Sequence, residues 1–127
     1  MAAPGSDPHL PRPAPIEAYG NGGFRFAGMS HRGSLLCLPD GIWAWPVTDL
    51  AGLTRSALEP VFARADRLDM FLIGAGRDPW MLPQDLRRLF HQRHISVDAM
   101  TTAAALRTWN VVVAEGRRAG AGLIAVS

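Results

Sequence analysis

From Leu58 onward, the sequence alternates segments of helical periodicity with short, almost continuous apolar runs. Four apolar residues at the spacing i, i+3, i+4 and i+7 would form one face of a helix: Leu58, Val61, Phe62 and Ala65. The run 68–73 that follows is nearly all apolar and ends at Gly74. Such a run is typical of a central strand covered on both faces. The pattern therefore requires a sheet with other layers on both sides.

The same alternation continues to the end of the sequence. After a helix that begins at Pro83, we expect a strand at 95–97, a helix from about 102 to 117 and a strand at 121–126. An order in which helices and strands alternate is typical of α/β proteins. We therefore predict an α/β fold, a three-layer sandwich with a mixed central sheet and helices on both faces.

The start of the first helix is ambiguous in the sequence. Ser56 and Glu59 have the spacing of a capping box, which favours a start at Ser56. Pro60 would fit better as the first helical residue, because proline is preferred at that position. Both starts stay open.

The residues before this alternation predict an N-terminal β-hairpin region. The segment 24–26 (Phe-Arg-Phe) alternates like a half-buried strand and follows a glycine-rich turn at 19–23. A second apolar run, 34–38, precedes the turn signal Asp40-Gly41, which indicates an antiparallel hairpin. Pro46 should end the second strand of that hairpin or lie at a sheet edge.

We expect a single α/β domain formed by residues 16–127, preceded by a flexible proline-rich tail, residues 1–15. Proline blocks regular hydrogen bonding, and Leu10 is the only sizeable apolar residue of the tail. The tail resembles neither a secretory signal nor an amphipathic presequence. No apolar run approaches the roughly 18 residues of a membrane span. We therefore expect a cytoplasmic protein without a membrane span.

The absence of lysine limits the chemistry of this chain, because all 13 basic side chains are arginine. A lysine Schiff base is impossible, which excludes pyridoxal-phosphate enzymes and lysine-dependent aldolases. The phosphate-binding lysine of P-loop nucleotidases and the strand lysine of protein kinases are missing too. The arginines are scattered and the net charge is only +2, so we expect no nucleic-acid partner.

Two short segments are candidates for a ligand site. Gly74 and Gly76 follow the predicted central strand, at the end where α/β sheets bind ligands, and glycine allows a close backbone approach. Thr101 and Thr102 open the third predicted helix, where free N–H groups can hold an anion or be capped by a hydroxyl. A tight strand exit and ordinary helix capping explain these residues without a ligand, and both interpretations stay open.

Arg107 is the only ionic side chain in the first three turns of the third predicted helix. A helix this apolar should be largely buried, and a buried guanidinium must be paired or hydrogen-bonded. With Asn110, about one turn further on the same stripe, it would form either a structural polar latch or a pocket wall that presents a guanidinium to an anionic group. The predicted pocket has six residues: Gly74, Gly76, Thr101, Thr102, Arg107 and Asn110.

No catalytic residue, metal site or cofactor is predicted. Cys37 lies in an apolar run and should be a small core residue. His91 and His94 could share a helix face, but no third ligand is evident, so we expect two surface histidines. His31 should be a loop residue without an acidic or nucleophilic partner. Asp69 opens the buried strand, where it could pair with an arginine.

Five segments are similar to those of a known family: GGFRF (22–26), HRGSLL (31–36), DMFLIGAG (69–76), MTTAAALRTWN (100–110) and AEGRR (114–118). They occur in order over residues 16–126, and the Arg-Thr-aromatic-Asn core is fairly specific. The chain thus resembles a small family of unknown function found in bacteria, archaea and mitochondria. The mitochondrial branch of that family is the third assembly factor of respiratory complex I.

The resemblance implies a three-layer α/β domain with a mixed sheet and no established catalytic activity. For the mitochondrial branch it implies a protein-binding role at the inner membrane with a partner assembly factor. This chain departs from the family pattern at Thr101, where an acidic residue or serine is common, at Ala103, where glycine is common, and at Trp109, where tyrosine or phenylalanine is common. These departures weaken the inference that residues near Thr101 carry out a reaction common to the family. Arg107 and Asn110 still match the family pattern.

Two hypotheses of function follow. The first is a non-enzymatic module that binds a protein partner and assists assembly of a respiratory membrane complex, peripheral to the membrane. Trp43, Trp45 or Trp80 would anchor the interface if exposed. The alternative is a binder of small anionic molecules, or an uncharacterised enzyme, with its pocket at the Gly74 loop and the third helix. The sequence does not indicate the oligomeric state.

Overall fold

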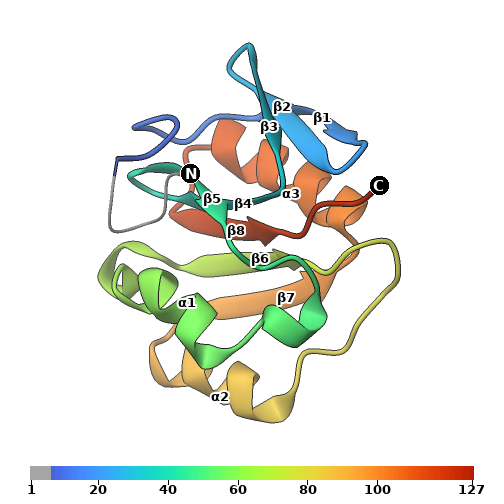
Figure 1. Cartoon of the computed structure of the whole chain (residues 1–127). Helices are drawn as coiled ribbons and strands as arrows, with labels where there is room; N and C mark the ends of the chain where they lie inside the picture. Colours follow the sequence, from blue (N-terminus) through green and yellow to red (C-terminus); the bar gives the residue numbers. More distant parts are fainter. Residues whose placement is uncertain (1–6) are drawn as a thin grey trace.

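A five-stranded mixed sheet forms the middle layer of the computed structural model, which describes residues 7–127 (Figure 1). The strand order is β5-β4-β8-β6-β7. The strands are β4 Ser34–Leu38, β5 Gly41–Trp45, β6 Met70–Gly74, β7 Ser96–Met100 and β8 Ala119–Leu123. β6 is parallel to β7 and β8, whereas β4 is antiparallel to β5 and β8. The predicted mixed sheet is confirmed.

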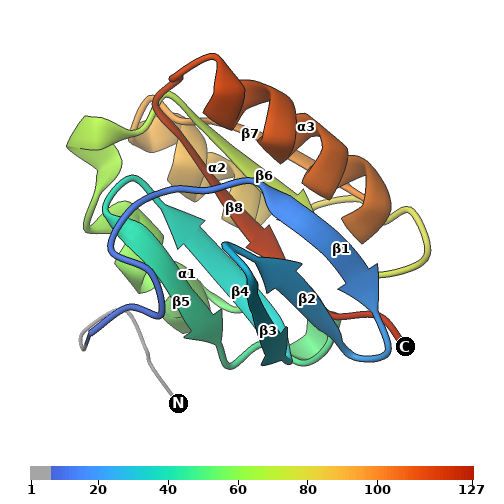
Figure 2. The ribbon, with the colours of Figure 1, turned by 90° about the horizontal axis from the view of Figure 1, so that it is seen from above.

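Helices cover both faces of this sheet, as predicted (Figures 1 and 2). α1 (Arg55–Phe62) and α2 (Gln84–Gln92) lie on one face, and α3 (Thr102–Ala114) lies on the other. Short 3-10 turns at Leu50–Gly52 and Ala65–Arg67 flank α1.

The side chains of β6 enter two different hydrophobic clusters. Phe71 and Ile73 belong to the cluster beneath α1 and α2, and Leu72 belongs to the cluster that contains Leu106 and Trp109 of α3. Because successive side chains of a strand point to opposite faces, both faces of β6 are buried. This explains why its sequence is an almost continuous apolar run.

A smaller antiparallel sheet, β1 (Ile16–Gly20), β2 (Gly23–Phe26) and β3 (Met29–Arg32), shares the α3 side of the central sheet (Figure 2). Phe24 and Phe26 are buried and Arg25 between them is exposed, which confirms the predicted alternation. β1 and β3 were not predicted. His31 lies in β3, so its interpretation as a loop residue is wrong. β3 is polar and mostly exposed, and hydrophobic periodicity therefore gives no signal for it.

Two-residue turns set the register of this small sheet. Asn21 and Gly22 have φ angles of 53° and 80°, and Ala27 and Gly28 have φ angles of 50° and 74°. Positive φ at both central residues is the geometry that suits the twist of a β-hairpin. The second turn places Ser30 opposite Arg25 on the neighbouring strand.

The predicted hairpin around Asp40-Gly41 is confirmed, since β4 and β5 pair and Leu38 lies opposite Gly41. Pro46 directly follows β5, which is an outer strand of the sheet. The last helix and strand are displaced from their predicted bounds, because the helix ends at Ala114 and the strand begins at Ala119.

The first helix begins ahead of both predicted starts. Thr54 is its N-cap, and its Oγ1 accepts a hydrogen bond from the Ala57 N–H at 3.3 Å. Pro60 lies inside the helix. Neither Ser56 as the cap nor Pro60 as the first residue is correct. Burial of one face of α1 (Leu58, Val61 and Phe62) outweighs the single backbone hydrogen bond that a proline removes.

Contacts with the domain begin before Ile16, the predicted boundary. The His9 N–H donates to the Ile42 carbonyl at 2.9 Å, and the Ile42 N–H donates to the Leu10 carbonyl at 2.9 Å. Ala14 is buried, and its carbonyl accepts a hydrogen bond from Trp109 Nε1 at 3.0 Å. Of the predicted flexible tail, residues 1–6 lie outside the described residues.

Candidate functional site

Three of the predicted site residues, Gly74, Gly76 and Thr102, meet where β6 and β8 end. Thr102 Oγ1 donates to the Ile124 carbonyl at 2.7 Å and accepts from the Gly76 N–H at 2.9 Å. The Thr102 N–H donates to the Gly76 carbonyl at 2.8 Å, and the Ile124 N–H donates to the Gly74 carbonyl at 2.9 Å. Thr102 is 0% exposed. We call these four residues the Thr102 latch. Both hydrogen bonds of the Thr102 hydroxyl are formed with other residues of the protein.

Gly74 serves packing within this latch. A Cβ at Gly74 would lie 3.0 Å from Thr102 Cα and 3.1 Å from Leu123 Cδ2. Gly76 has a φ of 106°, which side chains other than glycine rarely adopt. The close backbone approach that glycine permits here is therefore made by α3 and β8.

Thr101 is the N-cap of α3, as the capping interpretation predicted. Its Oγ1 accepts a hydrogen bond from the Ala104 N–H at 3.2 Å, and its carbonyl accepts one from the Ala105 N–H at 2.9 Å. The first of these bonds satisfies one of the free N–H groups of the first turn, and the second is the first regular hydrogen bond of the helix. Anion binding at this helix terminus stays a prediction.

Arg107 is exposed, and its side chain takes part in no hydrogen bond or ion pair within residues 7–127. The expectation that this guanidinium is buried and paired is therefore wrong. One face of α3 packs on the sheet, and the other carries apolar residues into solvent, such as Val111, which is 56% exposed. The apolar composition of α3 thus led to an expectation of more burial than the structure shows.

Asn110 binds the small sheet instead of the Gly74 loop. Its Nδ2 donates to the Ile16 carbonyl at 2.9 Å, and its Oδ1 accepts from the Ile16 N–H at 2.7 Å. The side-chain amide thus forms with the Ile16 backbone the pair of hydrogen bonds that a neighbouring strand would form. Thr102 is sealed, Arg107 faces solvent and Asn110 holds β1, so the structure does not bring the six predicted residues to one pocket. An anionic ligand there stays a prediction.

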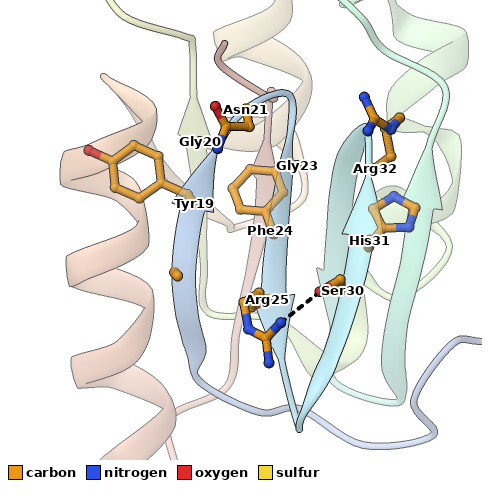
Figure 3. A pocket seen from close by; sticks show the side chains of 10 residues that line it. Tyr19, Gly20, Asn21, Gly23, Phe24, Arg25, Ser30, His31 and Arg32 are labelled. Carbon is orange, nitrogen blue, oxygen red and sulfur yellow. Dashed lines mark hydrogen bonds between the residues drawn. The ribbon is translucent and has the colours of Figure 1, made fainter.

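Sequence reasoning missed a hollow of about 410 Å³ on the small sheet (Figure 3). All three strands and the Asn21 turn line it. Its polar lining includes Arg25 from β2 and His31 and Arg32 from β3, and Tyr19 of β1 also lines it. The hollow is on the solvent side of this sheet, since Arg25 is exposed between two buried phenylalanines.

The charge of this basic hollow is positive. Arg25 Nη1 donates to Ser30 Oγ at 2.9 Å, which fixes one guanidinium over the sheet (Figure 3). Arg25 and Arg32 are exposed, and neither takes part in an ion pair within the described part of the chain. The lining contains no aspartate or glutamate. Two unpaired guanidinium groups suit carboxylates or phosphates, which they can bind through two hydrogen bonds each.

His31 is held in place at the rim of the basic hollow. Its Nε2–H donates to the Ser34 carbonyl at 3.2 Å, and its ring lies 4.8 Å from the ring of His9. Partial burial lowers the pKa of His31 below its ordinary value; the hydrogen bond to Ser34 opposes this shift, and His9 adds to it. Ser30 is bonded to Arg25 and His31 to Ser34, so no nucleophile–base pair is formed by these two side chains. The geometry suits binding.

The other candidate residues have structural surroundings. Cys37 is fully buried, and burial raises the pKa of its thiol. His91 and His94 are exposed, as predicted. Asp69 pairs with Arg118 at 3.6 Å on the surface. Among residues 7–127, no three His, Cys, Asp or Glu side chains are placed to hold a metal ion.

The tryptophans do not supply the predicted interface anchors. Trp43 and Trp45 are each 3% exposed and belong to the core beneath α1 and α2. Trp80 is partly buried against the same cluster. β5 is an outer strand, but its tryptophans point into the core, so the expectation for Trp43 and Trp45 is wrong.

The turn at Ala27-Gly28 brings the residues of the basic hollow together. A two-residue turn there pairs Arg25 with Ser30 and brings Arg32 to the adjacent strand. The two arginines are scattered in the sequence but line one surface in the sheet. Since alanine rarely adopts positive φ, the turn has no obvious sequence signature.

Comparisons with known proteins support the fold and the family. An uncharacterized Rhodobacter capsulatus protein is 39% identical over 111 residues, which is 87% of this chain and 83% of that protein. A Bartonella henselae structure described as an outer membrane protein has a TM-score of 0.89 and 47% identity, covering 94% of this chain and 100% of that one. No helix within residues 7–127 has the length and apolar character needed to cross a membrane.

A more distant relative has a named role. The mouse protein named NADH dehydrogenase [ubiquinone] 1 alpha subcomplex assembly factor 3 is 27% identical over 115 residues, 91% of this chain. The present chain spans 62% of the mouse protein's length. The family model described as Protein of unknown function (DUF498/DUF598) matches residues 16–124. That range includes both sheets and all three helices, and the chain therefore belongs to this family, as the resemblance of its sequence segments predicted.

Proposed function

We propose that this protein is a non-enzymatic module that binds a protein partner and assists assembly of a respiratory membrane complex. The observation that carries the proposal is the similarity to the mouse assembly factor over 91% of this chain. The similarity extends over the folded domain, so the proposal concerns a role that one α/β domain can perform.

The basic hollow is the surface that we propose for the partner. Arg25 and Arg32 are exposed and without ion pairs among the described residues, and Tyr19, which also lines the hollow, is 45% exposed. Arginine and tyrosine are enriched among the residues that contribute most to protein interfaces. The matching surface of the partner is acidic, with carboxylates that meet the two guanidinium groups.

The proposal places the protein in the cytoplasm, peripheral to the membrane complex. Cell fractionation tests this placement directly, because the Bartonella relative is described as an outer membrane protein. We expect recovery in the cytoplasmic fraction and, in part, on the inner membrane, released by high salt. Recovery in the outer-membrane fraction would overturn this placement.

The test of function is capture from native extract combined with a deletion strain. The full chain, tagged and expressed in its own cells, should retain a specific partner that belongs to complex I or to its assembly intermediates. Deletion of the gene should lower the amount of intact complex I on native gels. Recovery of no specific partner together with unchanged complex I would contradict the proposal.

A matched pair of double variants locates the interface. Arg25→Glu with Arg32→Glu reverses both charges of the basic hollow, and Arg107→Glu with Arg117→Glu reverses two exposed arginines elsewhere. We expect the first variant to retain at most about one tenth of the partner that the wild type retains. The second variant should retain as much partner as the wild type. Equal retention by both variants would mean that the partner binds another surface. Melting temperatures should confirm that both variants fold.

A further inference from the structure

The two outer strands of the central sheet differ in what lies along their free sides. Beside β5, residues His9 and Leu10 form backbone hydrogen bonds with Ile42 at 2.9 Å, so this edge has a partial cover. Beside β7, at the opposite end of the sheet (Figure 1), no segment within residues 7–127 forms a backbone hydrogen bond with the outer side of the strand.

The backbone pattern identifies which groups of β7 are free. The Ser96 N–H donates to the Asp69 carbonyl at 2.9 Å, and the Met100 carbonyl accepts from the Ala75 N–H at 2.8 Å. These residues therefore direct their backbone groups toward β6. Since the direction alternates along a strand, Val97 and Ala99 direct their N–H and C=O groups away from the sheet.

A hollow of about 370 Å³ lies beside this edge. Pro79, Trp80, Met81 and Leu82, from the segment between β6 and α2, line it together with Arg87 of α2 and with Asp98 and Ala99 of β7. Met81 is 87% exposed, the largest value among the exposed large hydrophobic residues of the described chain. Trp80 and Ala99 pack against the same core cluster, so the hollow lies on the α2 side of the strand.

We propose that this β7 edge binds an extended segment of a partner protein as a sixth strand of the central sheet. The free groups of Val97 and Ala99 are complementary to another strand, because only an extended backbone presents donors and acceptors at the same spacing. A side chain opposite Ala99 would enter the hollow and cover Met81. The inference rests on the proposed protein-binding function and names a second surface for it, separate from the basic hollow.

Charge determines the chemistry of the added strand. Asp98 lies opposite Leu72, which belongs to the α3 cluster, so its side chain projects on the face of the sheet that α3 covers. Asp98 is exposed and forms no ion pair within the described residues. The partner strand therefore carries a basic residue opposite Asp98 and an apolar residue opposite Ala99, in alternation.

The same carboxylate disfavours a second copy of this chain as the occupant. In the antiparallel register that pairs Val97 of one copy with Ala99 of the other, the two Asp98 residues would lie directly opposite each other. Like charges in that position destabilise a strand pair, and a charged residue at an edge is a common obstacle to self-association.

A displayed library of random twelve-residue peptides, selected on the full chain, is the probe that tests the proposal. Enriched peptides should alternate apolar and basic residues. When such a peptide binds, the amide protons of Val97 and Ala99 should exchange at least about tenfold more slowly in NMR spectra. Failure to enrich any peptide, or protection of amides only in the small sheet, would overturn the proposal.

Three variants distinguish binding at this edge from nonspecific binding of peptides. Met81→Glu places a charge at the hollow and should weaken the selected peptides about tenfold, and Asp98→Arg should change the selected peptides from basic to acidic. Asp66→Arg, at an exposed aspartate outside the hollow, should change neither. Equal binding to all three variants, or a dimer in sedimentation that Met81→Glu dissociates, would contradict the proposed occupant.

The outcomes distinguish this proposal from the proposed function. A native partner that depends on Arg25 and Arg32 and ignores Met81→Glu would support the function and overturn strand addition. Peptides that add to β7 in a protein whose deletion leaves complex I unchanged would support strand addition and contradict the assembly role.

Discussion

The Thr102 latch and the basic hollow use polar side chains in opposite ways. In the latch, the Thr102 hydroxyl is fully buried and binds Ile124 and Gly76 at 2.7 and 2.9 Å. In the hollow, Arg25 and Arg32 are exposed and have no ion pair among the described residues. The polar groups of the latch therefore form their hydrogen bonds within the fold, whereas the guanidinium groups of the hollow remain available to bind another molecule.

This difference shows why position at the carboxyl end of a strand is insufficient evidence for a ligand site. Ligands bind at such ends when backbone and side-chain groups there remain free. Here α3 begins directly over the Gly74 loop, and its first residue takes up those groups. If the comparison is right, substitutions in the latch should change stability, and substitutions in the hollow should change binding.

The largest expected effect is that of Thr102→Val. The variant leaves the Ile124 carbonyl and the Gly76 N–H without partners, and each unsatisfied buried group costs roughly 1–3 kcal/mol. We expect the free energy of unfolding to fall by about 3 kcal/mol in urea titrations. Thr102→Ser, which keeps the hydroxyl and loses one methyl, should lose only about 1 kcal/mol. Equal losses in both variants would show that packing, not hydrogen bonding, makes the latch important.

Asn110→Ala should have the next largest effect. It removes both hydrogen bonds between α3 and Ile16, and we expect a loss of about 1–2 kcal/mol. The Ile16 amide should exchange faster, which hydrogen exchange can follow residue by residue. Asn110→Asp, which keeps an acceptor but no donor, should be intermediate. Unchanged exchange at Ile16 would mean that the small sheet is held by its apolar face alone.

A smaller effect is expected from the pH dependence of His31. Partial burial lowers its pKa in the folded protein, so below the ordinary value of about 6.5 the unfolded chain binds the proton more readily. Stability should therefore fall as pH decreases from that value toward the folded-state pKa. Melting temperatures of wild type should decline more steeply there than those of His31→Gln. Parallel curves would assign the pH dependence to other groups.

Arg107→Ala should have the smallest effect. The side chain is exposed and without partners among the described residues, so stability should change by less than about 0.5 kcal/mol. A thermal-shift screen with anionic metabolites should give the same result for the variant and the wild type. A metabolite that stabilises only the wild type would restore the predicted pocket and break the comparison between the two regions.

Several features of this chain could be predicted from sequence because one local rule governs each of them. The apolar runs and helical spacings from Leu58 onward predicted the order of helices and strands, and the turn at Asp40-Gly41 predicted the β4–β5 hairpin. Thr101 was correctly interpreted as a helix cap, since capping depends only on neighbouring backbone groups.

Other features depend on contacts between distant residues, and the sequence did not indicate them. The bond of Asn110 to Ile16 spans 94 positions, and no periodicity encodes it. Arg107 was expected to be buried because α3 is apolar, yet which face of α3 meets the sheet decided its exposure. β3 was missed because its polar residues pair with β2 through a turn at Ala27-Gly28.

The sequence by itself determined the layers of this protein, the alternation of its elements and its family. Periodic burial is a local property, and a run such as β6 records both faces of its sheet in five residues. Only the tertiary structure decided which polar groups are satisfied internally and which remain free. That depends on which segments meet. α3 closes the Gly74 loop, the hairpin turn at Ala27-Gly28 brings Arg25 and Arg32 to one surface, and no other strand of residues 7–127 lies along the outer side of β7.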